Sequence, residues 1–239
     1  MGMLRVDKII AATGLYSRRE VKLLVRQGRV LADGKVVTSA EEKIDPEVTE
    51  LLVDGKAVAY RAYTYIMMNK PAGVLSATED PRAETVLSLL PPELRRRGLF
   101  PVGRLDKDTE GLLLLTNDGA LAHELLSPRK HVDKEYFART EGQVDRTDCD
   151  AFAAGMTLGD GLVCLPAGLR TGEEPGTCYV TLREGKFHQV KRMLADRGKP
   201  VTYLRRLRMG NLTLDPTLVE GEFRFLTDDE VRNLKNFVR

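Results

Sequence analysis

The chain of 239 residues is 42% hydrophobic and 30% charged, which is ordinary for a soluble globular protein with one large domain or a large and a small one. No apolar run approaches the roughly 20 residues that a membrane-spanning helix needs, and the N-terminus has no apolar signal-peptide core. The odd number and wide spacing of the cysteines suggest a reducing cytosol, so we expect a cytoplasmic protein. Three widely spaced cysteines and three histidines offer neither a disulfide framework nor zinc-ligand spacing, and no Walker or G-x-G-x-x-G loop predicts a nucleotide cofactor.

The net charge of +2 is unevenly distributed along the chain. Residues 1–35 contain eight Lys and Arg against three acids, residues 183–208 contain nine against two, and residues 41–55 contain six acids and one Lys. Basic side chains on helices are often simply solvated. Two basic segments this far apart in sequence nevertheless favour one composite surface for a polyanion, and we prefer nucleic acid as that polyanion.

The N-terminal residues predict a small unit of two helices followed by short strands. Apolar residues at near-helical spacing predict a helix over residues 4–12. A second helix is predicted to begin after Ser17, which forms a capping box with Glu20, and its basic residues fall on or near the side away from its apolar stripe. Residues 29–37 predict a hairpin around an Asp-Gly turn, and residues 50–53 predict a further strand.

The motifs of this unit are Arg5-Val6-Asp7-Lys8, Ser17-Arg18-Arg19, and Gly28-Arg29-Val30 with Asp33-Gly34. On these motifs, about residues 3–60 resemble an S4-type RNA-binding domain, and we place that domain at residues 1–60. The resemblance implies that its helices and hairpin bind the backbone of structured RNA, which provides affinity and register rather than sequence choice. The residues expected to contact RNA here are Arg5, Lys8, Ser17, Arg18, Arg19, Lys22, Arg26 and Arg29.

Residues 61–239 are expected to form a second domain of short strands and helices. A strand over residues 65–70 ends in a Pro/Gly turn, and a short helix over residues 85–90 is ended by Pro91-Pro92. The other predicted elements are a buried strand at 112–115, a helix at 121–126, strands at 134–139, 162–165, 178–182 and 203–208, a helix within 183–194, and a last helix capped by Thr227 and Glu230.

Residues 103–119 join closely spaced charged side chains to an apolar run. Arg104, Asp106, Asp108 and Glu110 precede the four leucines at 112–115, which are typical of a buried strand. A loop attached directly to the core can hold a reactive carboxylate still. Acidic loops before strands are also common as solvated surface, and this stretch alone does not decide between the two interpretations.

A calcium-binding loop is a third interpretation of the same stretch. Asp106, Asp108, Glu110 and Gly111 fit the first half of the EF-hand pattern. The twelfth position is Asn117 rather than a bidentate glutamate, and a run of leucines occupies the second half. The pattern therefore fails, and we expect no metal site.

Further motifs accompany this stretch in chain order. They are Asn69-Lys70-Pro71 with Gly73, then Gly103-Arg104-Leu105-Asp106 through Gly119, then Lys134-x-Tyr136, then Glu184-Gly185 with His188-Gln189-Val190-Lys191-Arg192-Met193. On these motifs nearly the whole chain resembles the RsuA/RluB/RluE/RluF family of bacterial rRNA pseudouridine synthases. The segment Ser127-Pro128-Arg129-Lys130-His131, together with Pro166-Ala167, most resembles sequences of the family branch that acts on the small-subunit 16S rRNA.

The resemblance implies an α+β protein in which a small S4-type domain precedes a catalytic domain with a mixed, largely antiparallel sheet flanked by helices. It implies an enzyme that isomerises a specific uridine to pseudouridine. Because this isomerisation involves no redox change and loses no group, we expect no cofactor. The expected partner is structured ribosomal RNA, either 16S rRNA or a 30S assembly intermediate. We expect the protein to be a monomer and not to bind a membrane.

The resemblance also implies roles for individual residues. Asp106 corresponds to the catalytic carboxylate, Tyr136 to the aromatic residue that stacks on the flipped uracil, and Lys191 to the cation that pairs with the aspartate. Arg104 is expected to fill the space that the flipped base leaves or to hold its phosphate. Leu105 and Val190 are expected to line the uracil pocket, and further RNA contacts are expected from Lys186, His188, Gln189 and Arg192.

Three other functions stay open at this point. A non-catalytic S4 RNA-binding protein is one, although the intact set of Asp106, Tyr136 and Lys191 argues against it. A synthase of the same family that acts on 23S rRNA is the second. A hydrolase that uses Asp106 with Glu110 is the third, and the absence of tryptophan argues against it because sugar-binding sites commonly use aromatic residues.

Overall fold

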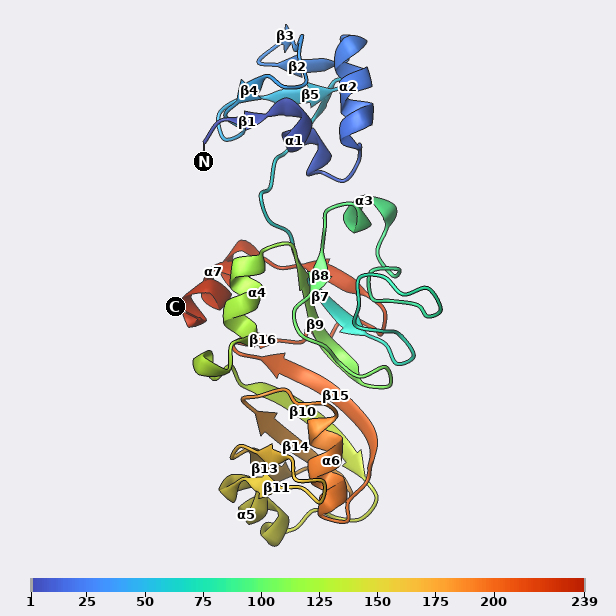
Figure 1. The fold of residues 1–239 in the computed structure, drawn as a ribbon, viewed down its shortest axis with the longest axis vertical. Coiled ribbons are helices and arrows are strands. Elements are labelled where there is room, and N and C mark those ends of the chain that lie inside the picture. Colours follow the sequence, from blue (N-terminus) through green and yellow to red (C-terminus); the bar gives the residue numbers. More distant parts are fainter. Residues whose placement is uncertain (1, 239) are drawn as a thin grey trace. The chain divides into compact units, whose positions relative to one another are not determined.

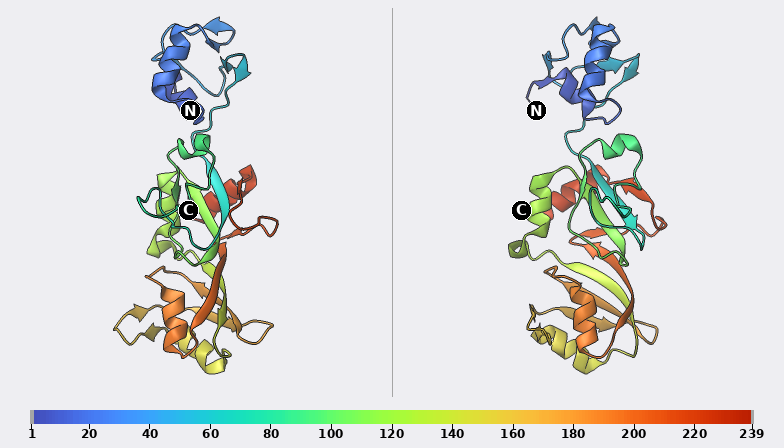
Figure 2. Two further views of the ribbon diagram at one scale, coloured as in Figure 1. Left: turned by 90° about the vertical axis from the view of Figure 1, so that its right-hand side faces the viewer. Right: turned by 45° about the vertical axis from the view of Figure 1, so that its right-hand side comes forward.

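The structure, a computed structural model, describes residues 2–238 and divides into two compact units (Figures 1 and 2). The first unit consists of the chain up to Thr64 together with a later segment, Leu87–Phe100. The second unit consists of Tyr65–Val86 and the chain from Pro101 onward. Among residues 2–238, no helix combines the length and the apolar character that crossing a membrane requires.

The first unit consists of short helices and small antiparallel sheets. Its elements are β1 (Leu4–Arg5), α1 (Val6–Ala11), α2 (Arg18–Arg26), β2 (Val30–Ala32), β3 (Lys35–Val36), β4 (Lys43–Ile44), β5 (Leu51–Val53), β6 (Lys56–Ala57) and α3 (Pro92–Arg95). The helix expected at residues 4–12 is shorter, because its first two residues form β1 and pair with β4. The predicted capping box of Ser17 and Glu20 begins α2. The predicted hairpin turns at Asp33 and Gly34, whose positive φ angles suit a tight two-residue turn.

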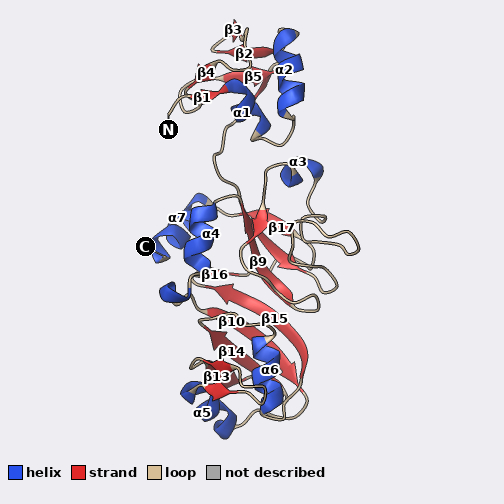
Figure 3. Cartoon of the chain, viewed as in Figure 1, coloured by secondary structure: helices blue, strands red, loops and turns tan. Residues whose placement is uncertain are grey.

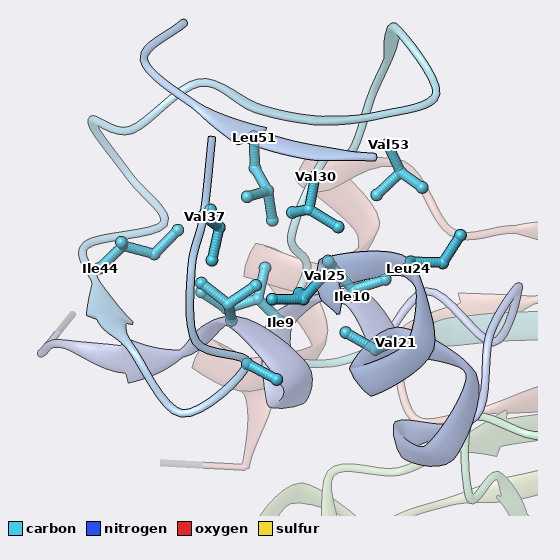
Figure 4. Packing of buried hydrophobic residues seen from close by; sticks show 12 residues of the cluster. Ile9, Ile10, Val21, Leu24, Val25, Val30, Val37, Ile44, Leu51 and Val53 are labelled. Carbon is cyan, nitrogen blue, oxygen red and sulfur yellow. The ribbon is translucent and has the colours of Figure 1, made fainter. Parts of the chain in front are cut away.

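The core of the first unit is a cluster of aliphatic side chains from α1, α2 and the strands (Figure 4). Val6 and Ile10 of α1 and Val21 of α2 are each 0% exposed. Leu24 and Val25 complete the buried stripe of α2. Because one side of α2 is committed to this core, its basic side chains lie at the surface.

Leu87–Phe100 differs from the sequence prediction. The helix expected at residues 85–90 is wrong: Thr85 forms an isolated β-bridge with Leu75, residues 86–89 form turns, and α3 begins at Pro92 instead. Proline is favoured in the first turn of a helix because it has no N–H to leave unpaired, so Pro91-Pro92 marks a start rather than an end. Arg97 ties this segment to the rest of the first unit, since its Nε donates to the carbonyl oxygen of Thr13 at 2.9 Å.

The second unit is built on one large sheet (Figure 3). Its elements are β7 (Tyr65–Lys70), β9 (Glu110–Thr116), α4 (Gly119–Leu126), a 3-10 turn (Pro128–Lys130), β10 (Lys134–Thr140), α5 (Arg146–Ala154), β11 (Met156–Thr157), β12 (Val163–Cys164), β13 (Gly168–Thr171), β14 (Thr177–Leu182), α6 (Gln189–Asp196), β15 (Val201–Met209), β16 (Leu212–Thr213), β17 (Phe223–Phe225) and α7 (Asp228–Phe237), and β8 (Phe100–Pro101) spans the boundary in sequence. The strand order is β13-β14-β10-β15-β9-β7-β17, with only β15 and β9 parallel along this order. The predicted mixed, largely antiparallel sheet is confirmed.

Helices cover parts of this sheet. In Figure 3, α6 lies against the strands β10, β14 and β15. Its Val190, Met193 and Leu194 are buried, as the apolar stripe predicted. The helices α4 and α7 lie side by side (Figure 1), and Nζ of Lys235 is 3.8 Å from Oδ2 of Asp118. The sheet is therefore flanked by helices, as expected for this fold class.

Gly111 connects the loop that contains Asp106 to the buried leucines of β9. Its φ is 99°, and residues 112–115 are at most 1% exposed. A Cβ atom at position 111 would lie 2.3 Å from the carbonyl oxygen of Arg206 in β15. Only glycine therefore permits the parallel contact of β9 with β15 at this point.

Replacing Gly111 with alanine is expected to destabilise the fold more than the same change at Gly161. Both residues have positive φ (99° and 85°), and such backbone strain costs about 1–3 kcal/mol with a side chain present. Nothing lies within 4 Å of a Cβ atom at Gly161. The free energy of unfolding, measured by urea denaturation, should fall by about a further 1–3 kcal/mol in Gly111→Ala, and equal losses would contradict the close contact.

Candidate active site

Asp106 lies in the loop before β9, and its carboxylate faces two basic side chains at the start of α6. Its Oδ2 is 3.3 Å from Nζ of Lys191, and its Oδ1 is 3.5 Å from Nε2 of His188. The Asp106 side chain is 25% exposed. The carboxylate is thus accessible to a ligand while it is held beside a cation.

Lys191 contacts a second carboxylate as well. Its Nζ is 2.5 Å from Oδ1 of Asp108, which is nearer than its distance to Asp106. The hydrogen bond from Lys191 lowers the pKa of Asp108 below its ordinary value. Asp108 had no assigned role in the sequence interpretation, and the structure makes it part of the ion-pair cluster.

Lys70, the last residue of β7, is fully buried inside the turn of this loop. Its Nζ lies at hydrogen-bonding distance from the carbonyl oxygens of Pro71 (3.0 Å), Asp106 (3.1 Å), Lys107 (3.2 Å) and Thr109 (2.9 Å). An ammonium group has three donor protons, so these four acceptors satisfy it. Burial lowers the pKa of Lys70 to about 8. One side chain therefore joins the loop from Asp106 to Thr109 to the turn that follows β7.

Asp106 opens onto a cavity of about 490 Å³. Tyr136, on the buried face of β10 and 8% exposed, lines the same cavity. Two buried cations, Lys134 of β10 and Arg206 of β15, line it too. Burial lowers the pKa of Lys134, and the neighbouring positive charge of Arg206 lowers it further. The site therefore places one carboxylate and one aromatic ring in mainly cationic surroundings.

The structure brings together most of the residues predicted for the catalytic domain. Those that line this cavity or a smaller one beside Asp106 and Tyr136 are Arg104, Leu105, Asp106, Tyr136, Lys186, His188, Gln189 and Val190. Lys191 reaches Asp106 from α6, as described. Arg192 points to a different partner, because its guanidinium forms an ion pair with Asp160.

Gln189 is 3% exposed and its side chain is used inside the loop that precedes α6. Its Nε2 donates to Oε1 of Glu184 at 2.6 Å, and its Oε1 accepts from the backbone N–H of Lys186 at 3.0 Å. Glu184 also accepts from the backbone N–H of Leu165 at 2.9 Å. Burial favours a raised pKa at Glu184, but these hydrogen bonds and the Lys186 ammonium outweigh it and leave that pKa lowered. The loop is therefore cross-linked by its own polar side chains.

The predicted RNA-binding residues of the first unit lie mainly at its surface. Exposed side chains on the two helices are Lys8, Arg18, Arg19, Lys22 and Arg26. The other three have partners within the unit: Arg5 lies 2.7 Å from Asp7, Arg29 lies 2.6 Å from Asp54, and Ser17 caps α2. The exposed basic side of α2 is thus available to a polyanion.

Sequence reasoning assigned no role to Lys70, Thr109 or Arg206. The sequence does place Lys70 at the end of an apolar strand, where a charged residue can indicate a special role. Arg206 lies in the strand predicted at residues 203–208, which is rich in arginine. Oγ1 of Thr109 and Nη2 of Arg206 are buried without a hydrogen-bond partner among residues 2–238. Nothing in the sequence distinguishes Thr109. In the described part of the chain, no three His, Cys, Asp or Glu side chains gather as a metal site requires.

Comparison with protein families matches two segments of the chain. Residues 64–196 match the RNA pseudouridylate synthase family, and residues 4–49 match the S4 domain. The first match covers more than half of the chain and contains Asp106, Tyr136 and Lys191.

Individual proteins match over almost the full length. The chain is 49% identical to an uncharacterised RNA pseudouridine synthase of Bacillus subtilis, covering 97% of this chain and 98% of that protein. It is 39% identical to ribosomal small subunit pseudouridine synthase A of Pseudomonas aeruginosa, covering 95% and 99%. The protein of the same name in Escherichia coli is 37% identical, covering 97% and 100%. A crystal structure of a pseudouridylate synthase, 34% identical, matches 97% of this chain and 99% of its own with a TM-score of 0.68.

Lys70 is expected to make the stability of the fold depend on pH. Its pKa is about 8 in the folded protein and near 10.5 in an unfolded chain, so the unfolded chain binds more protons between these pH values. The free energy of unfolding therefore rises with pH across this range, by up to about 3 kcal/mol. Chemical denaturation should show this rise in the wild type and a smaller one in Lys70→Met, which keeps the side-chain length. Parallel curves for the two proteins would contradict the buried charge.

Proposed function

This chain belongs to the RNA pseudouridylate synthase family and is an RNA pseudouridine synthase, and from this premise we propose that it isomerises a specific uridine of 16S ribosomal RNA with Asp106 as its catalytic carboxylate. The observation that supports this role is the place of Asp106 at the cavity, where its carboxylate shares the space with Tyr136 and pairs with Lys191. Among the described residues, the other carboxylate that lines this cavity is Glu184, and it already accepts hydrogen bonds from Gln189 and from the backbone N–H of Leu165.

The reaction needs little beyond one positioned carboxylate. The N1–C1′ bond of uridine breaks, the base turns, and a C5–C1′ bond forms, while C5 loses a proton and N1 gains one. No electrons are transferred overall. Asp106 serves either as a nucleophile, which adds covalently and is released again, or as a base that assists removal of a proton from the sugar. Its fixed loop suits both routes, because either one requires a carboxylate held in place.

A uridine in structured RNA must leave its stack to enter a cavity of this kind. Tyr136 offers the flipped uracil a replacement face, since it lines the cavity beside Asp106. Leu105 and Val190 supply apolar walls near the same atoms. Arg104 is exposed at the cavity, where it suits the space that the base leaves or the phosphate of the flipped nucleotide.

Lys191 places a cation 3.3 Å from the Asp106 carboxylate, so the two side chains form an ion pair in a partly buried site. The ammonium acts as a point charge that can serve two acceptors, unlike the planar fork of an arginine. This property fits its shared position between Asp106 and Asp108. We assign Asp108 the role of orienting Lys191 rather than of reacting with substrate.

The proposal of 16S rRNA rests on the relatives from Pseudomonas aeruginosa and Escherichia coli, whose names refer to the ribosomal small subunit. The match to the S4 domain and the exposed basic side of α2 support binding to structured RNA. We place RNA binding in residues 1–60 and catalysis in residues 61–239. We further propose that the protein acts as a cytoplasmic monomer on 16S rRNA or on a 30S assembly intermediate.

Asp106→Asn is expected to abolish pseudouridine formation while rRNA binding persists, because the amide neither adds to the substrate nor accepts a proton. Asp108→Asn is the matched control: it changes the other carboxylate bound to Lys191 and should retain turnover within about tenfold, the loss of one charge-assisted hydrogen bond. Turnover is measured on rRNA from cells that lack the gene, with pseudouridines mapped along both large rRNAs. Normal turnover by Asp106→Asn would exclude the assignment, and a new pseudouridine only in 23S rRNA would redirect the substrate.

Removing two charges from α2 is expected to weaken RNA binding in a salt-dependent way. For Arg18→Gln/Arg19→Gln, the slope of log K against log salt should become shallower by about 1.5, since each lost phosphate contact removes roughly 0.7–0.9 from it. Arg146→Gln/Arg232→Gln is the control, because it removes two exposed charges from α5 and α7 instead. An identical slope in both double variants would contradict RNA binding by α2.

A further inference from the structure

Phe187 is the most exposed aromatic side chain among residues 2–238, at 68%. It lies in the loop between β14 and α6 and lines the cavity of about 490 Å³ onto which Asp106 opens. Single exposed apolar side chains are common on protein surfaces and need no special explanation. The position of Phe187 at this cavity, and the rigidity of its support, distinguish it from such cases.

The loop holds the ring of Phe187 in place without burying it. The ring stacks on His188 with centroids 3.8 Å apart and planes 18° apart. His188 itself has a φ of 50°, which is uncommon for a residue with a side chain. The amide of Gln189 binds Glu184 and Lys186 and so cross-links the same loop. One face of Phe187 is therefore covered by a fixed ring, and its exposed surface is left for a ligand.

The charges around Phe187 favour a polyanion. The cavity is lined by five Lys or Arg and by two carboxylates, which are Arg104, Lys134, Arg183, Lys186, Arg206, Asp106 and Glu184. Asp106 is paired with Lys191, and Glu184 accepts hydrogen bonds from Gln189 and from the backbone N–H of Leu165. A ligand that combines phosphates with flat apolar rings matches such a surface, and single-stranded RNA has this chemistry.

We propose that Phe187 stacks on the base next to the target uridine and so holds the RNA strand while the uridine occupies the cavity. This inference rests on the proposed function of the same site. The His188 ring links the two positions, since it stacks on Phe187 while its Nε2 lies 3.5 Å from Asp106. A base on the open face of Phe187 is thus separated from Asp106 by two aromatic rings, those of Phe187 and His188. The backbone between a flipped uridine and its neighbour in the strand can span this separation.

The test compares Phe187→Leu with Phe187→Trp in the full-length protein. Leucine keeps an apolar side chain but removes the flat face, whereas tryptophan keeps that face. Stacking of one base on an aromatic ring predicts that Phe187→Leu raises KM for rRNA from cells that lack the gene by about tenfold or more, with kcat within about twofold. Phe187→Trp should stay within about threefold of the wild type in both constants, a margin well below that stacking effect.

Phe225→Leu is the matched control. Phe225 in β17 is also exposed, at 47%, but it does not line the cavity, so its KM should equal that of the wild type. A second arm uses a synthetic RNA around the converted uridine, with each neighbouring base removed in turn. One abasic position should abolish the difference between wild type and Phe187→Leu, because the stacking partner is then absent.

Three results would overturn the stacking role while the wild type still makes pseudouridine. They are equal KM values for the leucine and wild-type proteins, a tryptophan variant as weak as the leucine variant, and a difference that persists on every abasic RNA. The first of these would point instead to a protein partner for the exposed ring. Failure of the wild type to convert any rRNA uridine would contradict the proposed function itself, so the two ideas are tested separately.

Discussion

The burial of Lys70 inside the loop that bears Asp106 is the interaction on which the rest of the site depends. Desolvation lowers the pKa of this lysine, and four backbone carbonyl oxygens compensate for the buried charge. These carbonyls belong to both the turn after β7 and the loop before β9. The two segments are therefore fixed to each other, and the position of the carboxylate is set by the sheet rather than by a flexible loop.

The second constraint is electrostatic. A polyanionic substrate requires a cationic surface, whereas the proposed chemistry requires a carboxylate within it. Lys191 pairs with Asp106 and Asp108 and so balances the negative charge of both carboxylates. Lys134 and Arg206, which are buried at the cavity, add further positive charge. These cations pair with Asp106 or line the same cavity, so they offset the repulsion between its carboxylate and the phosphates of a bound RNA.

Features that depend on neighbours in sequence were predicted well. The capping boxes at Ser17 and Thr227 form because each needs only two residues three positions apart. The leucines of β9 are buried as predicted. The helix expected at residues 85–90 was wrong because the following prolines begin α3 instead of ending a helix. The parallel pairing of β15 with β9 was not predicted, since no local pattern records which distant strands meet.

The sequence by itself determined the family and the fold class, and it singled out Asp106, Tyr136 and Lys191 as the proposed catalytic set, because short motifs in a given order can be recognised without knowledge of the packing. Only the tertiary structure decided how these residues are held. Lys70 and Asp106 are 36 positions apart, and Lys191 and Asp108 are 83 apart. Such contacts arise when distant strands and helices pack together, so sequence spacing does not reveal them. The same packing leaves Phe187 exposed on a rigid loop at the mouth of the cavity.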